Sequence, residues 1–129
     1  MTVYLETSAA AKLLVEEAQS ASLAAYLDHL GDDARIVSSV LLETELRRLA
    51  VREGLPQDSV TQVLDRVDLF EPDRALFHQA GILPGPRLRS LDALHVAAAL
   101  RAEADAFVCY DQRQREAAIS VGLRLLAPA

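Results

Sequence analysis

The sequence predicts a three-layer α/β/α sandwich with a mainly parallel central sheet. Short apolar runs and helical patterns alternate along the chain, beginning with a strand at residues 3–5 and a helix at 8–14. Parallel strands need long crossover connections, and helices that supply them with right-handed connections cover both faces of the sheet. The sequence contains no internal repeat, low-complexity tract or linker. We therefore expect one domain spanning residues 1–129.

Local signals predict each element in turn. Strands are expected at residues 3–5, 35–38, 69–70, 107–109 and 124–126, where the chain is apolar over a short run. Helices are expected at residues 8–14, 20–30, 40–53, 58–67, 73–80, 91–102 and 111–122, with a Gly- and Pro-rich loop at 81–90. Ser8 should start the first helix, and Asp58 or Ser59 should cap the fourth. Ser90 and Asp111 should cap the last two helices.

Composition restricts the class of protein. Hydrophobic residues make up 51% and charged residues 25% of the chain, which is typical of a globular domain. The apolar runs are short and interrupted by charge, so none predicts a transmembrane span, and no secretory signal is recognisable at the N-terminus. The single cysteine, Cys109, cannot form an internal disulfide. These features predict a cytoplasmic protein that does not act at a membrane.

The net charge limits the partners that the protein can bind. The formal net charge is −6, which argues against a protein that coats nucleic acid through a basic surface. A nuclease is still compatible with this charge, because clustered active-site acids add negative charge that a bound metal ion offsets.

Acidic residues follow the ends of several expected strands. Glu6 ends the first strand, and Asp111 follows the strand at 107–109 by two residues. Asp92 lies at the start of the helix before that strand, and Glu45 lies about a turn and a half into the helix after the second strand. In parallel α/β sheets, ligands bind beyond the carboxyl ends of the strands. The four carboxylates are therefore expected at one end of the sheet.

Each of these acids also has an ordinary structural explanation. Asp111 can serve only as an N-cap, and Asp92 and Glu6 can serve only as favourable charges near helix N-termini. Glu45 can pair with Arg48 one turn further along a solvated helix face. Capping does not require four acids from separate segments to face one end of a sheet, so the combined pattern favours a shared site.

A shared site of carboxylates predicts a divalent cation. Converging carboxylates repel one another unless a positive charge neutralises them. All-oxygen ligands favour Mg²⁺ or Mn²⁺ over zinc, and the histidines are too widely spaced to suggest a Cys/His cluster. His95, three residues after Asp92, is expected to pack or to form a hydrogen bond rather than to bind metal. Such a site suits phosphoryl transfer, in which one metal ion activates a water and a second, about 4 Å away, stabilises the leaving oxygen.

Four segments resemble, in chain order, the motif regions of PIN-domain ribonucleases. They are VYLETSAAAKLL, VSSVLLETELRRLA, SLDALHVAAAL and YDQRQREAA. The resemblance is greatest to the VapC toxins of bacterial toxin–antitoxin pairs, and it spans residues 3–126. It implies a small PIN-like α/β/α domain with Mg²⁺- or Mn²⁺-dependent endoribonuclease activity. It also implies a homodimer that a VapB-type antitoxin holds in check.

The resemblance also implies roles for particular residues. The acidic catalytic and metal-binding positions of the family correspond to Glu6, Glu45, Asp92 and Asp111. Thr7 and Ser8 match the hydroxyl-bearing positions after the first acid, where either can bond a ligand water and Ser8 can equally be a plain helix cap.

The chain departs from the family pattern at one position. The family has aspartate where this chain has Glu6. The extra methylene group moves the carboxylate outward by about 1.5 Å. Because Mg²⁺ demands near-octahedral geometry, the departure bears on catalytic rate and metal preference.

Six arginines flank the motif segments and are candidate RNA-binding residues. They are Arg47, Arg48, Arg87, Arg89, Arg113 and Arg115. Arg87 and Arg89 lie on the loop just before Asp92, where they can hold a phosphate group. For each arginine the ordinary alternative is a solvated position or an intramolecular ion pair. An antitoxin is expected to place an arginine among the acids and a helix over the groove.

Three alternative functions are compatible with parts of the pattern. The first is a PIN-like module that binds RNA or an antitoxin but cleaves weakly because of Glu6. A phosphorelay receiver would need a lysine late in the chain, whereas the only lysine is Lys12. A haloacid-dehalogenase-type phosphatase would need two aspartates spaced by one residue after the first strand, and the sequence there is ETS. The nuclease therefore ranks above the last two.

Overall fold

Five parallel strands form the central sheet of the computed structural model, which describes residues 1–129. The strands are β1 (Thr2–Leu5), β2 (Arg35–Ser39), β3 (Asp68–Phe70), β4 (Ala106–Val108) and β5 (Leu125–Leu126). Their order is β3-β2-β1-β4-β5, and every neighbouring pair is parallel. The predicted parallel sheet is confirmed, and none of its strands runs in the opposite direction.

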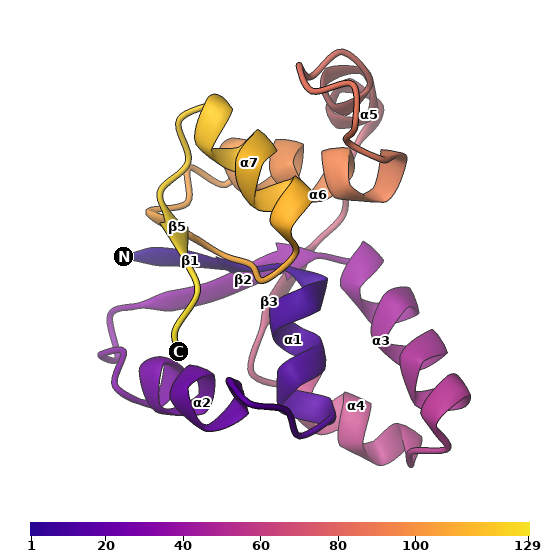
Figure 1. The fold of residues 1–129 in the computed structure, drawn as a ribbon, viewed down its shortest axis with the longest axis vertical. Coiled ribbons are helices and arrows are strands. Elements are labelled where there is room, and N and C mark those ends of the chain that lie inside the picture. The colour runs from indigo at the N-terminus through magenta and orange to yellow at the C-terminus, as the bar shows by residue number, and fades with distance from the viewer.

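Helices cover both faces of the sheet and complete the predicted α/β/α sandwich (Figure 1). They are α1 (Thr7–Leu14), α2 (Ser20–Asp28), α3 (Leu41–Glu53), α4 (Gln57–Leu64), α5 (Arg74–Gly81), α6 (Ser90–Arg101) and α7 (Gln112–Ser120). The first four helices lie on one side of the sheet and the last three on the other. No helix is long and apolar enough to cross a membrane.

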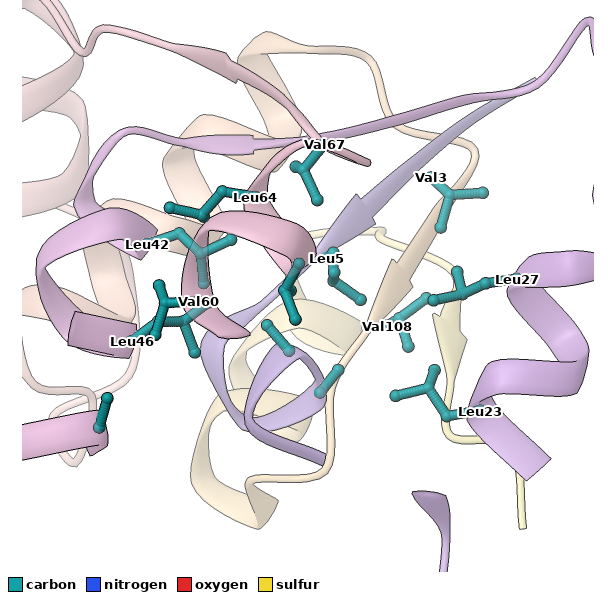
Figure 2. Packing of buried hydrophobic residues seen from close by; sticks show 14 residues of the cluster. Val3, Leu5, Leu23, Leu27, Leu42, Leu46, Val60, Leu64, Val67 and Val108 are labelled. Atoms are coloured by element: carbon teal, nitrogen blue, oxygen red, sulfur yellow. The ribbon is translucent and has the colours of Figure 1, made fainter. Parts of the chain in front are cut away.

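The alternation of side chains along β1 divides the core into two clusters. Val3 and Leu5 point into the cluster formed with α1–α4, where Leu23 and Leu46 are also fully buried (Figure 2). Tyr4 points to the opposite face, into the cluster formed with α5–α7. Successive residues of a strand face opposite sides, so the buried residues Val3–Leu5 fill both cores from the middle strand of the sheet.

The alanines of α6 bring this helix close to the sheet. Ala97, Ala98 and Ala99 are completely buried, as are Tyr4 and Phe107 on the facing strands. The rings of Tyr4 and Phe107 stack with their centroids 5.5 Å apart. Small side chains on the helix leave room for these large rings on the strands, so α6 and its first-turn residue Asp92 are held firmly against the sheet.

Three predicted helix starts are wrong. The N-cap of α1 is Glu6 and not Ser8, because the Glu6 carboxylate accepts the N–H of Ser8. Ser90 is the first residue of α6, after Arg89, which caps the helix without a side-chain hydrogen bond. Neither Asp58 nor Ser59 caps α4. That helix begins after Pro56, whose extended backbone fits the N-cap position.

Other boundaries differ by a few residues. Helix α4 ends at Leu64 rather than at residue 67, because the N–H groups of Arg66 and Val67 bond to the carbonyls three residues back and form a tight turn. β4 ends one residue earlier than predicted and β5 begins one residue later. Asp111 caps α7 as predicted, since its carboxylate accepts the N–H of Gln114. These shifts leave the order of the elements unchanged.

Candidate active site

The candidate acids lie where the direction of the chain across the sheet reverses. After β1 the chain moves to β2 and β3 on one side, and later it returns to β4 and β5 on the other. Glu6 follows β1 directly, and Asp111 follows the neighbouring β4. The N–H of Glu6 bonds to the carbonyl of Val108 at 3.1 Å. A crevice outside the carboxyl ends of such strands is where open α/β sheets bind ligands.

Ser8 connects the acid after β1 with the segment after β4. Its hydroxyl donates to Oε2 of Glu6 and accepts the N–H groups of Tyr110 at 2.8 Å and Asp111 at 3.2 Å. Oε2 of Glu6 also accepts the N–H of Ser8 at 2.8 Å. Both hydrogen bonds from Ser8 reach Oε2, so Oε1 takes no donor from Ser8. The predicted role of Ser8 as a plain cap is replaced by a bridging role between two acidic segments.

Burial gives Glu6 unusual electrostatics. The residue is only 4% exposed, and loss of hydration raises the pKa of its carboxyl, against the smaller opposing effects of the Ser8 hydrogen bond and of His95. Cys109 lies behind it, fully buried and free of any disulfide as predicted. Burial, followed by the charge of Glu6, raises the pKa of the Cys109 thiol. A thiol held in its protonated form is no nucleophile, so the chemistry of this site falls to the carboxylates.

Asp92 and Asp111 lie near the N-termini of two helices, α6 and α7. Partial burial and then the charge of Asp111 raise the pKa of Asp92, while Arg113 and His95 oppose the shift. Gln114 holds the two segments together because its buried side chain donates to the carbonyl of Asp92 at 3.2 Å. Like charges that are held together in this way favour the binding of a cation.

Glu45 is tied to the same end of the sheet, although not through the residue that was predicted as its ordinary partner. Its Oε1 accepts the hydroxyl of Thr7 at 2.9 Å and lies 2.6 Å from Nε2 of His95. No ion pair joins it to Arg48. His95 is 1% exposed and makes hydrogen bonds, as predicted. Thr7 therefore contacts an acid directly. Because Thr7 follows Glu6 in the chain, it links the Glu45 carboxylate to the segment that carries Glu6.

The acids fit a divalent cation in charge and donor type but do not form a ready-made ligand cluster. None of the ion pairs of the structure includes Glu6, Asp92 or Asp111. Their oxygens are the donors that Mg²⁺ and Mn²⁺ prefer. No group of three or more His, Cys, Asp or Glu side chains lies close enough together to hold one ion as arranged here. The structure thus brings the four acids to one end of the sheet, and their joint action on a metal stays a prediction.

The candidate RNA-binding arginines fall into two groups. Arg47 is engaged within the protein, because it pairs with Glu43 at 2.9 Å and bonds to Gln57 at 3.1 Å. The other five form no ion pair: they are Arg48, Arg87, Arg89, Arg113 and Arg115. Arg87 and Arg113 line the same pocket of about 220 Å³, between the loop before α6 and helix α7. None of the four acids lines the pocket, but the charge of Arg113 reaches the site and opposes the rise in the pKa of Asp92.

Sequence reasoning did not find two residues that organise the site. Tyr4 and Gln114 are completely buried, and both are bonded to residues of the site, Tyr4 to His95 and Gln114 to Asp92. Tyr4 looks like a core residue of a strand, and Gln114 looks like a surface residue of a polar helix. Only the polar character of a residue at a buried position distinguishes them, and that position is visible only after folding.

Sequence comparison identifies the class of protein to which this parallel α/β/α fold, with acids beyond the neighbouring strands β1 and β4, belongs. The PIN domain family matches residues 3–120. Ribonuclease VapC35 of Mycobacterium tuberculosis is 44% identical over 134 aligned positions, which cover 98% of this chain and 96% of the relative. Ribonuclease VapC46 of the same species is 35% identical over 130 positions, covering 98% of each. The chain therefore belongs to the PIN-domain family, among the VapC ribonucleases.

The fold also matches a solved structure of this kind. VapBC2 from Rickettsia felis, bound to a DNA fragment from its promoter, superposes with a TM-score of 0.78 at 16% identity, covering 100% of both chains. At this identity the similarity supports the fold alone. It agrees with the α/β/α fold that the sequence predicts.

Proposed function

We propose that the protein is the toxin of a type II toxin–antitoxin pair and acts as a Mg²⁺- or Mn²⁺-dependent endoribonuclease. Its four-carboxylate site consists of Glu6, Glu45, Asp92 and Asp111. The observation that carries the proposal is that these acids come from four segments to one end of the sheet, three of them without a cationic partner. Membership of a family of ribonucleases supports the reaction type.

The residues would divide the work between them. A divalent cation bound to these carboxylates supplies positive charge at the phosphate and lowers the pKa of an attacking water. Asp92 and Asp111 would hold it from two helix N-termini, and Glu6 would contribute Oε1, the oxygen that takes no donor from Ser8. Glu45, whose side chain is 23% exposed, would bind the cation from the solvent side, directly or through a water.

RNA would reach the acids along the arginine pocket. Arg87 and Arg113 line it together with Glu116 and form no ion pair, and Arg89 and Arg48 are exposed close in sequence to Asp92 and Glu45. Guanidinium groups bind phosphate oxygens through paired hydrogen bonds. A strand of RNA held here would bring a phosphodiester bond to Asp92. The net charge of −6 means that these few arginines, and not the whole surface, would provide the attraction.

A VapB-type antitoxin and a second copy of the chain are the proposed protein partners. One solved structure with a similar fold is a VapBC complex bound to promoter DNA. An arginine of the antitoxin would compensate the acids that no arginine of this chain pairs with, and an antitoxin helix would cover the groove beside them.

A specific observation supports a second candidate, a PIN-like module that binds RNA or antitoxin and cleaves weakly. Glu6 replaces the aspartate of the family, is almost completely buried, and uses one oxygen as the N-cap of α1. A carboxylate engaged in this way is less free to satisfy an octahedral metal. Cleavage by the purified protein decides between the two candidates.

The decisive experiment is incubation of the purified protein with total RNA in Mg²⁺, in Mn²⁺ and in chelator, followed by mapping of the cut ends. We expect cleavage at defined positions with metal, none with chelator, and none with Asp92→Asn. Cleavage by Asp92→Asn equal to the wild type would reject the site. Tight binding of RNA or antitoxin without any cleavage would support the second candidate, the PIN-like binding module.

A further inference from the structure

We propose that His95 is a positioning residue that aims the carboxylate of Glu45 at the metal site, an inference that rests on the proposed nuclease function. His95 lies in the first half of α6 and Glu45 in α3, and the two are separated by 50 positions in the chain. Their Nε2 and Oε1 atoms are 2.6 Å apart. The proposal assigns a purpose to a buried histidine that is not one of the four acids.

A chain of hydrogen bonds sets the orientation of the imidazole ring. The backbone N–H of Ser39 donates to the Tyr4 hydroxyl at 3.2 Å. That hydroxyl lies 2.7 Å from Nδ1 of His95. A carboxylate accepts hydrogen bonds and cannot donate them, so the 2.6 Å contact with Oε1 of Glu45 requires the proton of a neutral imidazole to reside on Nε2. Nδ1 then accepts the proton of the Tyr4 hydroxyl, and this second hydrogen bond holds the ring in the orientation in which Nε2 faces Glu45.

The receiving carboxylate is held at one oxygen and open at the other. Oε1 of Glu45 takes the His95 donor and the Thr7 hydroxyl, and Thr7 also lies 3.1 Å from Nε2 of His95. No hydrogen bond reaches Oε2, and the side chain is 23% exposed. Two donors on one oxygen remove most of the rotational freedom of a long side chain, so the second oxygen faces a fixed direction before any ligand arrives.

This arrangement differs from that of a histidine that merely fills the core. His95 is buried at 1% exposure and contacts β1 through Tyr4, α1 through Thr7 and α3 through Glu45. A packing role would require shape alone, and an apolar side chain of similar volume would satisfy it. Outer hydrogen-bond partners of metal ligands are known to tune affinity and activity by about 10–100-fold.

The test compares His95→Leu, which removes the donor, with His95→Gln, whose amide N–H can replace Nε2. The readouts are Mn²⁺ affinity by paramagnetic titration, kcat on RNA, and the side-chain carboxyl ¹³C resonance of Glu45 in chelator. We expect His95→Leu to weaken Mn²⁺ binding and to lower kcat about tenfold or more and to shift or broaden the Glu45 resonance. His95→Gln should restore most of each. The exposed His78→Leu is the matched control and should match the wild type.

A double-mutant cycle shows whether the effect passes through Glu45. In a Glu45→Gln background, His95→Leu should change Mn²⁺ affinity and kcat no further, because the acid it orients is already gone. An equal loss in both backgrounds overturns the proposal. So does a folded His95→Leu protein with unchanged Mn²⁺ affinity and an unchanged Glu45 resonance.

Two measurements on the wild type keep the inference separate from the proposed function. The imidazole ¹⁵N spectrum should show the His95 proton on Nε2, and a proton on Nδ1 alone overturns the proposal even when His95→Leu does not fold. If the wild type neither binds Mn²⁺ nor cleaves RNA, the proposed function fails. The Glu45 resonance in chelator then still reports whether His95 orients that carboxylate.

Discussion

The N–H of Asp111 donates to the hydroxyl of Ser8 at 3.2 Å, although the two residues are 103 positions apart in the chain. The same hydroxyl donates to Oε2 of Glu6. The Ser8 hydroxyl is thus hydrogen-bonded to the N-cap of α1, to the backbone that follows β4 and to the backbone of a second acid. This bridge makes the separation of Glu6 and Asp111 depend on a single residue, which gives the first prediction.

Ser8→Ala should destabilise the protein and loosen the site. The substitution leaves the N–H groups of Tyr110 and Asp111 without their acceptor, and leaving buried polar groups unpaired costs about 1–3 kcal/mol each. Urea unfolding in chelator should show the loss, and Mn²⁺ affinity should fall with it. Ser22→Ala, at a partly exposed position of α2, is the control and should be neutral. A Ser8→Ala protein with unchanged midpoint would show that water replaces the hydroxyl.

Asp92→Asn should abolish cleavage without unfolding the protein. Removing one charge relieves the burial cost and the repulsion from Asp111 that raise the pKa of Asp92, so the thermal midpoint in chelator should stay equal or rise. Activity should fall about 100-fold or more, the scale of losing one preorganised charged group.

Two substitutions of Asp111 should distinguish its role as a helix cap from its role in cleavage. Asp111→Asn keeps an N-cap acceptor for Gln114, so it should lose cleavage and keep stability. Asp111→Ala should lose both, with about 1 kcal/mol of destabilisation. Circular dichroism and thermal melts, measured beside the RNA assay, give the comparison. Full activity in both Asp92→Asn and Asp111→Asn would refute the proposed site.

Glu6→Asp should keep or raise activity. Aspartate is a good N-cap, and the shorter side chain restores the residue found in the family. Glu6→Gln should instead lose cleavage while it retains a capping oxygen. Initial rates in Mg²⁺ and in Mn²⁺ measure both effects. A complete loss of cleavage in Glu6→Asp would mean that activity requires the longer glutamate side chain, which reaches Ser8.

Stability in chelator should fall as the pH rises through the acidic range. Burial raises the pKa of Glu6 above its ordinary value of 4.5 and that of Asp92 above 3.8. Between the ordinary and the raised values the folded state binds more protons than the unfolded state, so the free energy of unfolding decreases with increasing pH in that window.

Urea unfolding from about pH 4 to about pH 8 tests this slope. Glu6→Gln should flatten it, because the amide does not titrate. The pKa of Asp73 is lowered by the Leu76 N–H and by Arg101. Its contribution is lost only as the pH falls below 3.8, outside the window. An identical slope in wild type and Glu6→Gln would show that Glu6 does not govern it.

Replacing Arg87 and Arg113 with glutamine should weaken RNA binding and leave the fold unchanged. Each lost phosphate contact should reduce the slope of binding against log salt by about 0.7 for single-stranded RNA. Binding of an RNA oligonucleotide to the Asp92→Asn protein at several salt concentrations measures this without cleavage. Arg52→Gln, an exposed change near the end of α3, is the control. An unchanged salt slope in the double variant would exclude the pocket as an RNA site.

The sheet and the order of elements were predictable because they depend on strong local patterns. Apolar runs such as Val3–Leu5 are typical of strands that are buried on both faces, as in a parallel sheet, and Gly54 ends α3 in a left-handed conformation with a φ of 68°. Asp111 was recognisable as a cap from its place before a polar helix. These patterns involve residues that are adjacent in the sequence, so they can be recognised without knowledge of the tertiary structure.

The site was predictable only as a set of acids at one end of the sheet. A sequence pattern does not contain the direction of a side chain, so the cap of α1 was assigned to Ser8, although the longer Glu6 side chain takes that place. The partner of Glu45 is His95, on another helix, and not Arg48 on the same one. Contacts between distant segments depend on how helices pack, and packing is decided by the whole core.

The central place of β1 links the timing of protein synthesis to the completeness of the site. Glu6 emerges from the ribosome among the first residues, but Val3 pairs with Ala106, and Asp111 follows that strand. Pairings between distant segments form late. A growing polypeptide therefore carries the first acid long before the last one, and the proposed site stays incomplete until β4 and the segment after it have been synthesised.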